Sequence, residues 1–318
     1  MSEAPDGSPE ALEQRLRAAM ADLAGPVSRL GVAVSGGPDS MALLDLAHRV
    51  FPGRVAAATV DHGLRAASAD EAAMVARWCA ERGIDHVTLH PDRPVEGNVQ
   101  AWARAVRYAL LDQWRTDMGL ALVLTAHHAD DQLETLLMRL SRGAGLSGLA
   151  AIRSLASAVA RPLLGVTKAE LIAYARARAL PFVDDPSNSD ARFDRAALRA
   201  RLAQAPWLDA RAAARSAAAL ADADAALRWL VEDLAARHVR VDTCAVRLEE
   251  TRFPRELLRR LLLHMIEIAD PDAPVPRGEA IDRLLAVAES GGKASIGALL
   301  VEGGSEWSVR PAPPRKKD

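Results

Sequence analysis

The chain has 318 residues, 50% of them hydrophobic and 26% charged, which excludes a wholly disordered protein and is enough for two domains. Its net charge of −2 argues against a general affinity for nucleic acid, although 40 lysines and arginines leave room for a local basic surface. No charge-free apolar run reaches the roughly 18 residues that a membrane helix needs. Acidic residues near the start do not fit a secretory signal, so we expect a cytoplasmic protein without a membrane segment.

The first part of the chain alternates between predicted strands and helices. An amphipathic helix is expected at 9–24 and a short strand from Val159, and apolar runs predict further strands at residues 32–34, 54–60, 86–90 and 120–125. Helical patterns separate these strands at residues 41–50, 68–82, 99–117 and from 131 onward. The alternation predicts an α/β fold with a doubly wound, mostly parallel sheet. Ligands of such sheets bind beyond the carboxyl ends of the strands.

The rest of the chain is expected to be mainly helical. Thr167 and Glu170 have the spacing of a capping box, which predicts a helix from there to residue 179. Later helices are predicted up to 240 and at 254–268 and 278–289, and the glycine pair at 303–304 predicts a hairpin over 294–310. A composition change near 205–210 separates a catalytic domain at 25–205 from a smaller helical domain with a basic tail at 206–318. The N-terminal helix, at 1–24, precedes the catalytic domain.

The segment Ser35-Gly36-Gly37-Pro38-Asp39-Ser40 joins the first strand to a helix. Adjacent glycines let backbone N–H groups approach a ligand closely, and the following helix adds the positive end of its dipole. The lysine of the GxxxxGK[ST] pattern is missing, so this is not a Walker loop. We interpret the segment as a phosphate-binding turn, and the alternative is a plain Gly-Pro turn capped by Asp39. A carboxylate beside phosphates makes sense if Asp39 holds Mg²⁺.

A second polar cluster follows the fourth predicted strand, at residues 125–135. Asp131 and Glu134 are three residues apart and share one helix face, with His127 just before them. Acidic residues are common in the first turn of a helix, so Asp130 and Asp131 have the alternative of being simple caps. A transition-metal site is the other alternative. Neither explains why the cluster lies at the same sheet edge as the glycine turn.

Together these motifs resemble a known family. SGGPDS at 35–40 resembles the signature of the PP-loop ATP pyrophosphatases, which cleave ATP between its α and β phosphates and adenylate a substrate. DHGLR at 61–65, HHADDQLET at 127–135 and RGAGLSGL at 142–149 are typical of the lysidine synthases of that family. The resemblance implies a catalytic set of Asp39 and Asp131, which hold Mg²⁺, and Glu134, which activates an amine. It implies ATP contacts from Ser35, Gly36, Gly37, Pro38, Asp39, Ser40, Asp61, His62, His127 and Arg142.

Basic residues in further family segments are expected to contact RNA. Residues 98–108 resemble the NxEAxARxxRY helix of the family, although Gln100 replaces the usual glutamate and removes a charge. Residues 193–199 resemble the RNxIR segment imperfectly, because Ala196 replaces the usual asparagine. The segments RPLL at 161–164 and DDPSN at 184–188 extend the match. The resemblance implies tRNA contacts from Arg104, Arg107, Lys168, Arg195 and Arg199.

The resemblance also implies a reaction. ATP adenylates the C2 carbon of the wobble cytidine of tRNA(Ile) with a CAU anticodon, and the ε-amine of L-lysine then displaces AMP to leave lysidine. Neither Cys79 nor Cys244 lies in a site loop, which argues against sulfur-transfer members of the family. Two alternatives stay open: a PP-loop ligase or amidotransferase for a small metabolite, and a non-catalytic ATP-binding module. A homodimer is left open as the assembly.

Overall fold

A computed structural model describes residues 8–24, 29–63, 68–92, 97–183, 194–273, 275–276 and 278–312, without the side chains of Ala24 and of 194–196. The chain divides into two compact units. The first is formed by residues 1–138 and 151–218, and the second by residues 139–150 and 219–318. Among the described residues, no helix combines the length and the apolar character needed to cross a membrane.

The first unit contains a six-stranded sheet in the order β3-β2-β1-β4-β6-β5. Its strands are β1 (Leu30–Ala33), β2 (Val55–Val60), β3 (Asp85–Leu89), β4 (Leu122–Leu124), β5 (Leu155–Ala156) and β6 (Val159–Ala160). Neighbouring strands run parallel except β5, which is antiparallel to β6. The predicted mostly parallel sheet is confirmed, as is a strand starting at Val159. The exposed, two-residue β5 was missed because it is too short to show a pattern.

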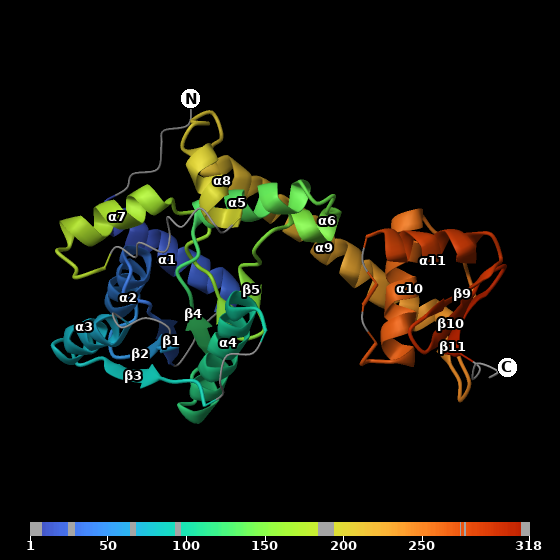
Figure 1. The fold of residues 1–318 in the computed structure, drawn as a ribbon, viewed down its shortest axis with the longest axis horizontal. Helices are drawn as coiled ribbons and strands as arrows, with labels where there is room; N and C mark the ends of the chain where they lie inside the picture. Colours follow the sequence, from blue (N-terminus) through green and yellow to red (C-terminus); the bar gives the residue numbers. More distant parts are fainter. Residues whose placement is uncertain are drawn as a thin grey trace. The chain divides into compact units, whose positions relative to one another are not determined.

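Helices cover both faces of this sheet (Figure 1). The helices of the first unit are α1 (Pro9–Ala24), α2 (Pro38–Val50), α3 (Ser68–Ala80), α4 (Val99–Asp117), α5 (Ala129–Leu140), α7 (Lys168–Ala177), α8 (Asp194–Leu202) and the start of α9 (Ala210–His238). Neighbouring residues of β2 enter different cores: Val55 and Ala57 join the cluster of α1, α2, α3 and α7. Ala56 and Ala58 instead join Leu111 of α4. Both faces are therefore buried, as parallel sheets require.

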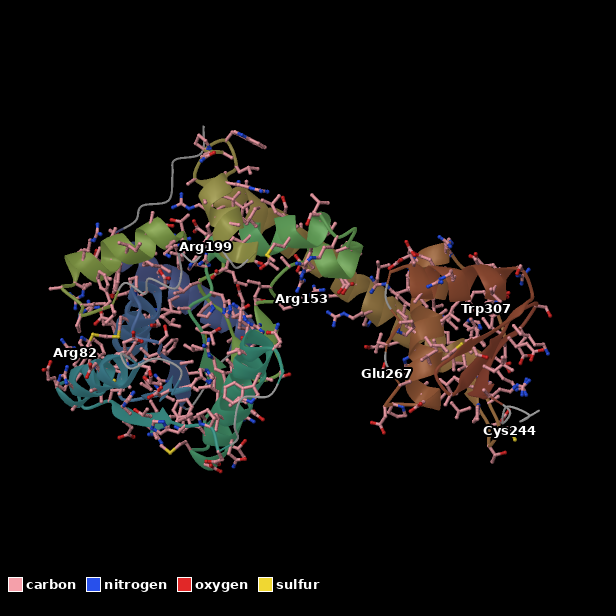
Figure 2. The ribbon with its side chains drawn as sticks, in the orientation of Figure 1. Arg82, Arg153, Arg199, Cys244, Glu267 and Trp307 are labelled. Atoms are coloured by element: carbon pink, nitrogen blue, oxygen red, sulfur yellow. The ribbon has the colours of Figure 1, made fainter. Side chains whose placement is uncertain are left out.

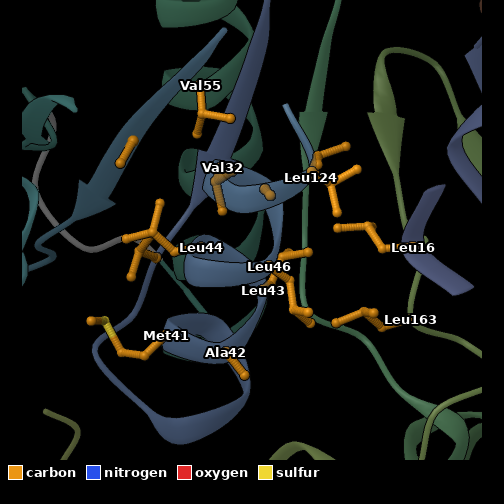
Figure 3. Packing of buried hydrophobic residues seen from close by; sticks show 14 of the residues in the cluster. Leu16, Val32, Met41, Ala42, Leu43, Leu44, Leu46, Val55, Leu124 and Leu163 are labelled. Carbon is orange, nitrogen blue, oxygen red and sulfur yellow. The ribbon is translucent and has the colours of Figure 1, made fainter. Parts of the chain in front are cut away.

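The larger buried cluster fixes the helix that follows the glycine turn. Leu43, Leu44 and Leu46 of α2 are fully buried and join Val32 of β1 and Leu16 of α1 in one core (Figure 3). Each fully buried leucine contributes about 1.5–3 kcal/mol to this packing. The N-terminus of α2 is therefore held firmly at the carboxyl edge of the sheet.

The second unit combines helices with an antiparallel sheet. Its helices are α6 (Leu146–Leu149), most of α9, α10 (Arg255–Ala269) and α11 (Glu279–Glu289). Its sheet has the order β7-β8-β11-β10-β9, formed by β7 (Val239–Val241), β8 (Val246–Leu248), β9 (Lys293–Ile296), β10 (Leu299–Glu302) and β11 (Trp307–Pro311). β10 and β11 pair on either side of Gly303 and Gly304. The sequence predicted this pairing within a helical domain but not β7 and β8, whose three residues each are too few for a strand pattern.

Candidate functional site

The glycine turn after β1 exposes the N-terminus of α2. Gly36 has a φ of +82°, a conformation that favours glycine, and the N-cap residue Gly37 provides no side-chain cap. Ser40 braces the turn, because its Oγ accepts a hydrogen bond from Ser35 N at 3.1 Å and donates one to Gly37 O at 3.0 Å. The first N–H groups of α2 therefore stay available, while the backbone that presents them is held in shape. This arrangement suits a phosphate group.

The turn opens into a cavity of about 810 Å³ at the carboxyl edge of the sheet. The sheet order reverses at β1, because β2 lies on one side of it and β4 on the other. This switch point is where parallel α/β sheets bind ligands. The residues after β1 and those after β4 both line the cavity, including Asp39, His127 and Asp131. The structure therefore brings together the two polar clusters that the sequence separates.

The first turn of α5 holds both aspartates of the second cluster. Asp131 Oδ2 accepts a hydrogen bond from His128 N at 3.1 Å, and Asp130 Oδ2 accepts one from Lys168 N at 2.8 Å. Asp131 therefore caps α5, as the capping alternative expected, whereas Asp130 accepts from the first residue of α7 instead. Asp131 lines the cavity, so its capping contact fixes a carboxylate that faces the ligand space.

His128 lies among three carboxylates, which sequence reasoning missed. Its ring nitrogens lie 3.5–3.6 Å from side-chain oxygens of Asp39, Asp130 and Asp131, and its side chain is 6% exposed. Burial disfavours the charged ring, but the three carboxylates outweigh this effect and raise the pKa of His128 to about 10. The available signal was the second histidine of the pair at 127–128, of which only His127 was considered. His128 links the glycine turn to α5.

Glu134 is buried behind an arginine from a distant part of the chain. Its side chain is 3% exposed, and Arg199 of α8, which Figure 2 labels, donates hydrogen bonds to Oε1 at 2.5 Å and to Oε2 at 3.1 Å. Arg199 also lies 3.7 Å from Asp131 Oδ1 and lines the cavity. Arg199 was expected to contact tRNA. In the structure it neutralises the carboxylates of α5.

Asp61 and His62 follow β2 at the same edge. Asp61 Oδ1 accepts hydrogen bonds from Ser68 Oγ at 2.7 Å and from Gly63 N at 2.8 Å, and these contacts lower the pKa of Asp61. Asp61 therefore anchors the connection between β2 and α3. His62 lines the cavity, and both of its ring nitrogens are buried without a partner among the described residues. Burial, assisted by Arg107, lowers the pKa of His62, so its neutral ring faces the ligand space.

Four further residues that the sequence predicted as ATP or tRNA contacts lie at the cavity. His127, Arg104, Arg107 and Lys168 all line the cavity. Thr125 Oγ1 lies 2.9 Å from His127 Nδ1, and burial lowers the pKa of His127 to about 4, so its ring is neutral. Arg104 lies over the ring of Tyr108, with 5.0 Å between the guanidinium carbon and the ring centroid. Arg104 and Arg107 add positive charge to the wall formed by α4.

The remaining expectations stay predictions. Arg142 belongs to the segment 139–150 of the second unit, so its ATP contact stays a prediction. The side chain of Arg195, the residues Leu64 and Arg65, and the turn at 184–188 lie outside the described residues. The basic tail at 315–317 does so too.

The carboxylates of the cavity fit a Mg²⁺ ion that also binds phosphates. Asp39 Oδ1 is buried without a hydrogen-bond partner among the described residues, which leaves it a free ligand atom. Within that same part of the chain, no three His, Cys, Asp or Glu side chains form a complete metal cage. Mg²⁺ is commonly held by one or two carboxylates together with phosphates and water. Asp39 and Asp131 meet this requirement. The described residues do not offer the three or more protein ligands that a transition-metal site needs.

The fold and this cavity are typical of α/β proteins that bind a phosphorylated ligand at a glycine turn. Residues 9–206 match the family model described as the PP-loop domain. The chain is 40% identical to the tRNA(Ile)-lysidine synthase of Zymomonas mobilis, over 93% of this chain and 92% of that one. It is 43% identical to that of Novosphingobium aromaticivorans, over 92% of each chain. Among solved structures, it resembles the U34-tRNA thiolase NcsA from Methanococcus maripaludis, with a TM-score of 0.53, 16% identity, and 66% and 76% of the two chains covered.

The thiolase likeness supports the fold alone. The two synthases match this chain over almost their whole length, through both units. The chain therefore belongs to the PP-loop family and, within it, to the tRNA(Ile)-lysidine synthase family.

Proposed function

We propose that this protein uses ATP to join L-lysine to C2 of the wobble cytidine of tRNA(Ile) with a CAU anticodon. The products are lysidine, AMP and pyrophosphate. The observation that supports this most is the single cavity at the switch point of the sheet, which joins an uncapped glycine turn to Asp39 and Asp131. The membership of the chain in the synthase family gives the substrate class.

The glycine turn binds the triphosphate of ATP. Backbone N–H groups at the start of α2 and the hydroxyl of Ser35 donate hydrogen bonds to phosphate oxygens. His62 and the ends of β1 and β2 line the part of the cavity that receives the adenosine. Asp39 and Asp131 hold Mg²⁺, which when bound offsets charge on the pyrophosphate leaving group. The catalytic domain at 25–205 supplies all of these groups.

The reaction proceeds in two displacement steps. The O2 oxygen of the cytidine attacks the α-phosphorus, the bond to the β-phosphate breaks, and pyrophosphate leaves. The ε-amine of lysine then attacks C2, the C–O bond breaks, and AMP leaves with that oxygen. The amine must lose protons, and Glu134 accepts one when Arg199 releases its carboxylate.

The RNA reaches this cavity through an unstacked base. A base inside a helical stack does not expose its O2 and C2 atoms to an in-line phosphorus, so the wobble nucleotide has to be splayed out. Arg104, Arg107 and Lys168 line the cavity and contact phosphates of the RNA, with Arg195 as a further contact. A cytoplasmic location and a homodimer remain predictions.

The product tests this function directly. The protein is incubated with ATP, isotope-labelled lysine and a tRNA(Ile) transcript with a CAU anticodon, and the RNA is digested and analysed by mass spectrometry. We expect a labelled lysidine nucleoside, and none when the anticodon is changed to UAU. Pyrophosphate release without any requirement for tRNA would instead favour a small-metabolite ligase. ATP binding without turnover would favour a non-catalytic module.

A further inference from the structure

Trp207 places a large aromatic side chain in solvent. It lies between α8 and α9 of the first unit and is 79% exposed, the highest value among the large hydrophobic residues that the structure describes. Tryptophan is usually buried for most of its surface, and an exposed one leaves a wide apolar ring in water. Neither the fold nor the proposed catalytic steps use this ring.

The turn that holds Trp207 is well defined. Ala205 N donates to Leu202 O at 2.9 Å, and Leu208 N donates to Ala205 O at 3.0 Å. Directly after it, Asp209 Oδ1 accepts from Arg211 N at 2.8 Å and caps the start of α9. Trp207 is therefore presented by backbone that is fixed on both sides, which lowers the entropy lost when a partner binds the ring.

Two exposed arginines lie within eight residues of Trp207 in the sequence. Arg201 in the last turn of α8 and Arg215 in α9 are exposed, and neither forms an ion pair with another described residue of the first unit. No other large hydrophobic side chain described between 194 and 218 is exposed. Protein interfaces are centred on contiguous apolar patches, whereas single-stranded nucleic acid is held by isolated aromatic rings flanked by arginines.

Trp207 follows directly in the sequence after α8, a helix that contributes a residue to the cavity. α8 supplies Arg199, which lines the cavity and pairs with Glu134, and it ends at Leu202 just before the turn. An RNA whose wobble base enters the cavity must have other unpaired loop nucleotides nearby, since an anticodon loop is single-stranded. We infer that Trp207 is a stacking platform for an unpaired base of the RNA substrate, other than the base that reacts. This inference rests on the proposed function.

Binding measurements with three variants test it. Trp207→Ala removes the ring, Trp207→Phe keeps an aromatic face, and Trp229→Ala removes another exposed tryptophan, 70% exposed, from α9 in the second unit. The dissociation constant of each for the tRNA(Ile) transcript is measured without ATP or lysine. We expect Trp207→Ala to weaken binding about 5- to 150-fold, and Trp207→Phe by less than about 5-fold. Trp229→Ala should bind as the wild type does, and the KM for ATP should not change in any variant.

Several results would overturn the inference. They are unchanged RNA binding by Trp207→Ala, equal losses in the alanine and phenylalanine variants, and equal losses in Trp207→Ala and Trp229→Ala. A change in sedimentation of Trp207→Ala without a change in RNA affinity would assign the ring to a protein contact and would also overturn it. Failure of the wild type to form lysidine would contradict the proposed function, and it is measured separately from these affinities.

Discussion

At the residue scale, Asp39 is the most direct test of the ATP site. Its Oδ1 atom has no hydrogen-bond partner among the described residues. Its Oδ2 atom lies 3.6 Å from His128 Nε2, but the His128 ring keeps Asp130 and Asp131 as carboxylate neighbours when Asp39 is replaced. We expect Asp39→Ala to keep its unfolding midpoint close to that of the wild type and to lower tRNA-dependent pyrophosphate release by about 100-fold or more, because a metal ligand is lost. AMP release at the wild-type rate would reject the metal-binding role of Asp39.

A substitution of Glu134 is expected to affect the two chemical steps differently. We expect Glu134→Gln to slow attack by lysine about 100-fold, since its carboxylate accepts a proton, and to affect adenylation much less. Single-turnover experiments that follow adenylated tRNA and lysidine separately measure both steps.

The matched control for this substitution is Glu170→Gln. Glu170 is also largely buried and pairs with two arginines, Arg15 and Arg211, both at 2.8 Å. Neither of these arginines lines the cavity, whereas Arg199, the partner of Glu134, does. Its loss should lower stability without separating the steps. Equal slowing of both steps in Glu134→Gln would contradict the role given to that carboxylate.

At the scale of elements, Gln132 ties the catalytic helix α5 to the segment before β5. It is 3% exposed, accepts a hydrogen bond from Ile152 N at 2.8 Å and donates one to Ile152 O at 2.9 Å. Gln132→Ala leaves both backbone groups without partners and should lower the free energy of unfolding by about 2–4 kcal/mol. Denaturant unfolding measures this.

The control for Gln132→Ala is Gln113→Ala on the exposed side of α4, where the glutamine side chain bonds to the exposed Asp117 and to no other described residue. Its effect should stay within about 0.5 kcal/mol. Similar values for the two variants would contradict the role of Gln132 as an anchor.

The sequence predicts those parts of the fold and site that depend on local pattern. An apolar run followed by paired glycines predicts β1, the turn and α2, and acidic residues after an apolar run predict the start of α5. Contacts between distant residues leave no such pattern. Glu134 and Arg199 are 65 positions apart, and only the folded chain shows that they pair. The same holds for His128 among its three carboxylates. The strands β7 and β8 of the second unit are too short to distinguish from loops.

At the scale of the whole molecule, a net charge of −2 means that RNA affinity must come from few, local cations. Arg104 and Arg107 of α4 are such cations, because they line the cavity. Replacing each by glutamine should reduce the slope of log affinity against log salt concentration by about 0.7–0.9. Arg17→Gln on the exposed side of α1 is the control and should leave the slope unchanged. An unchanged slope in both α4 variants would remove them from the RNA contacts.

The central claim is that the α-phosphorus of ATP is transferred to the O2 oxygen of an RNA base before lysine attacks. A tRNA(Ile) transcript whose wobble cytidine carries ¹⁸O at position 2 tests this most directly, with the released nucleotide analysed by mass spectrometry. We predict that AMP carries the heavy oxygen and that its amount equals that of lysidine. Release of ADP, or of AMP without ¹⁸O while lysidine still forms, would contradict the account.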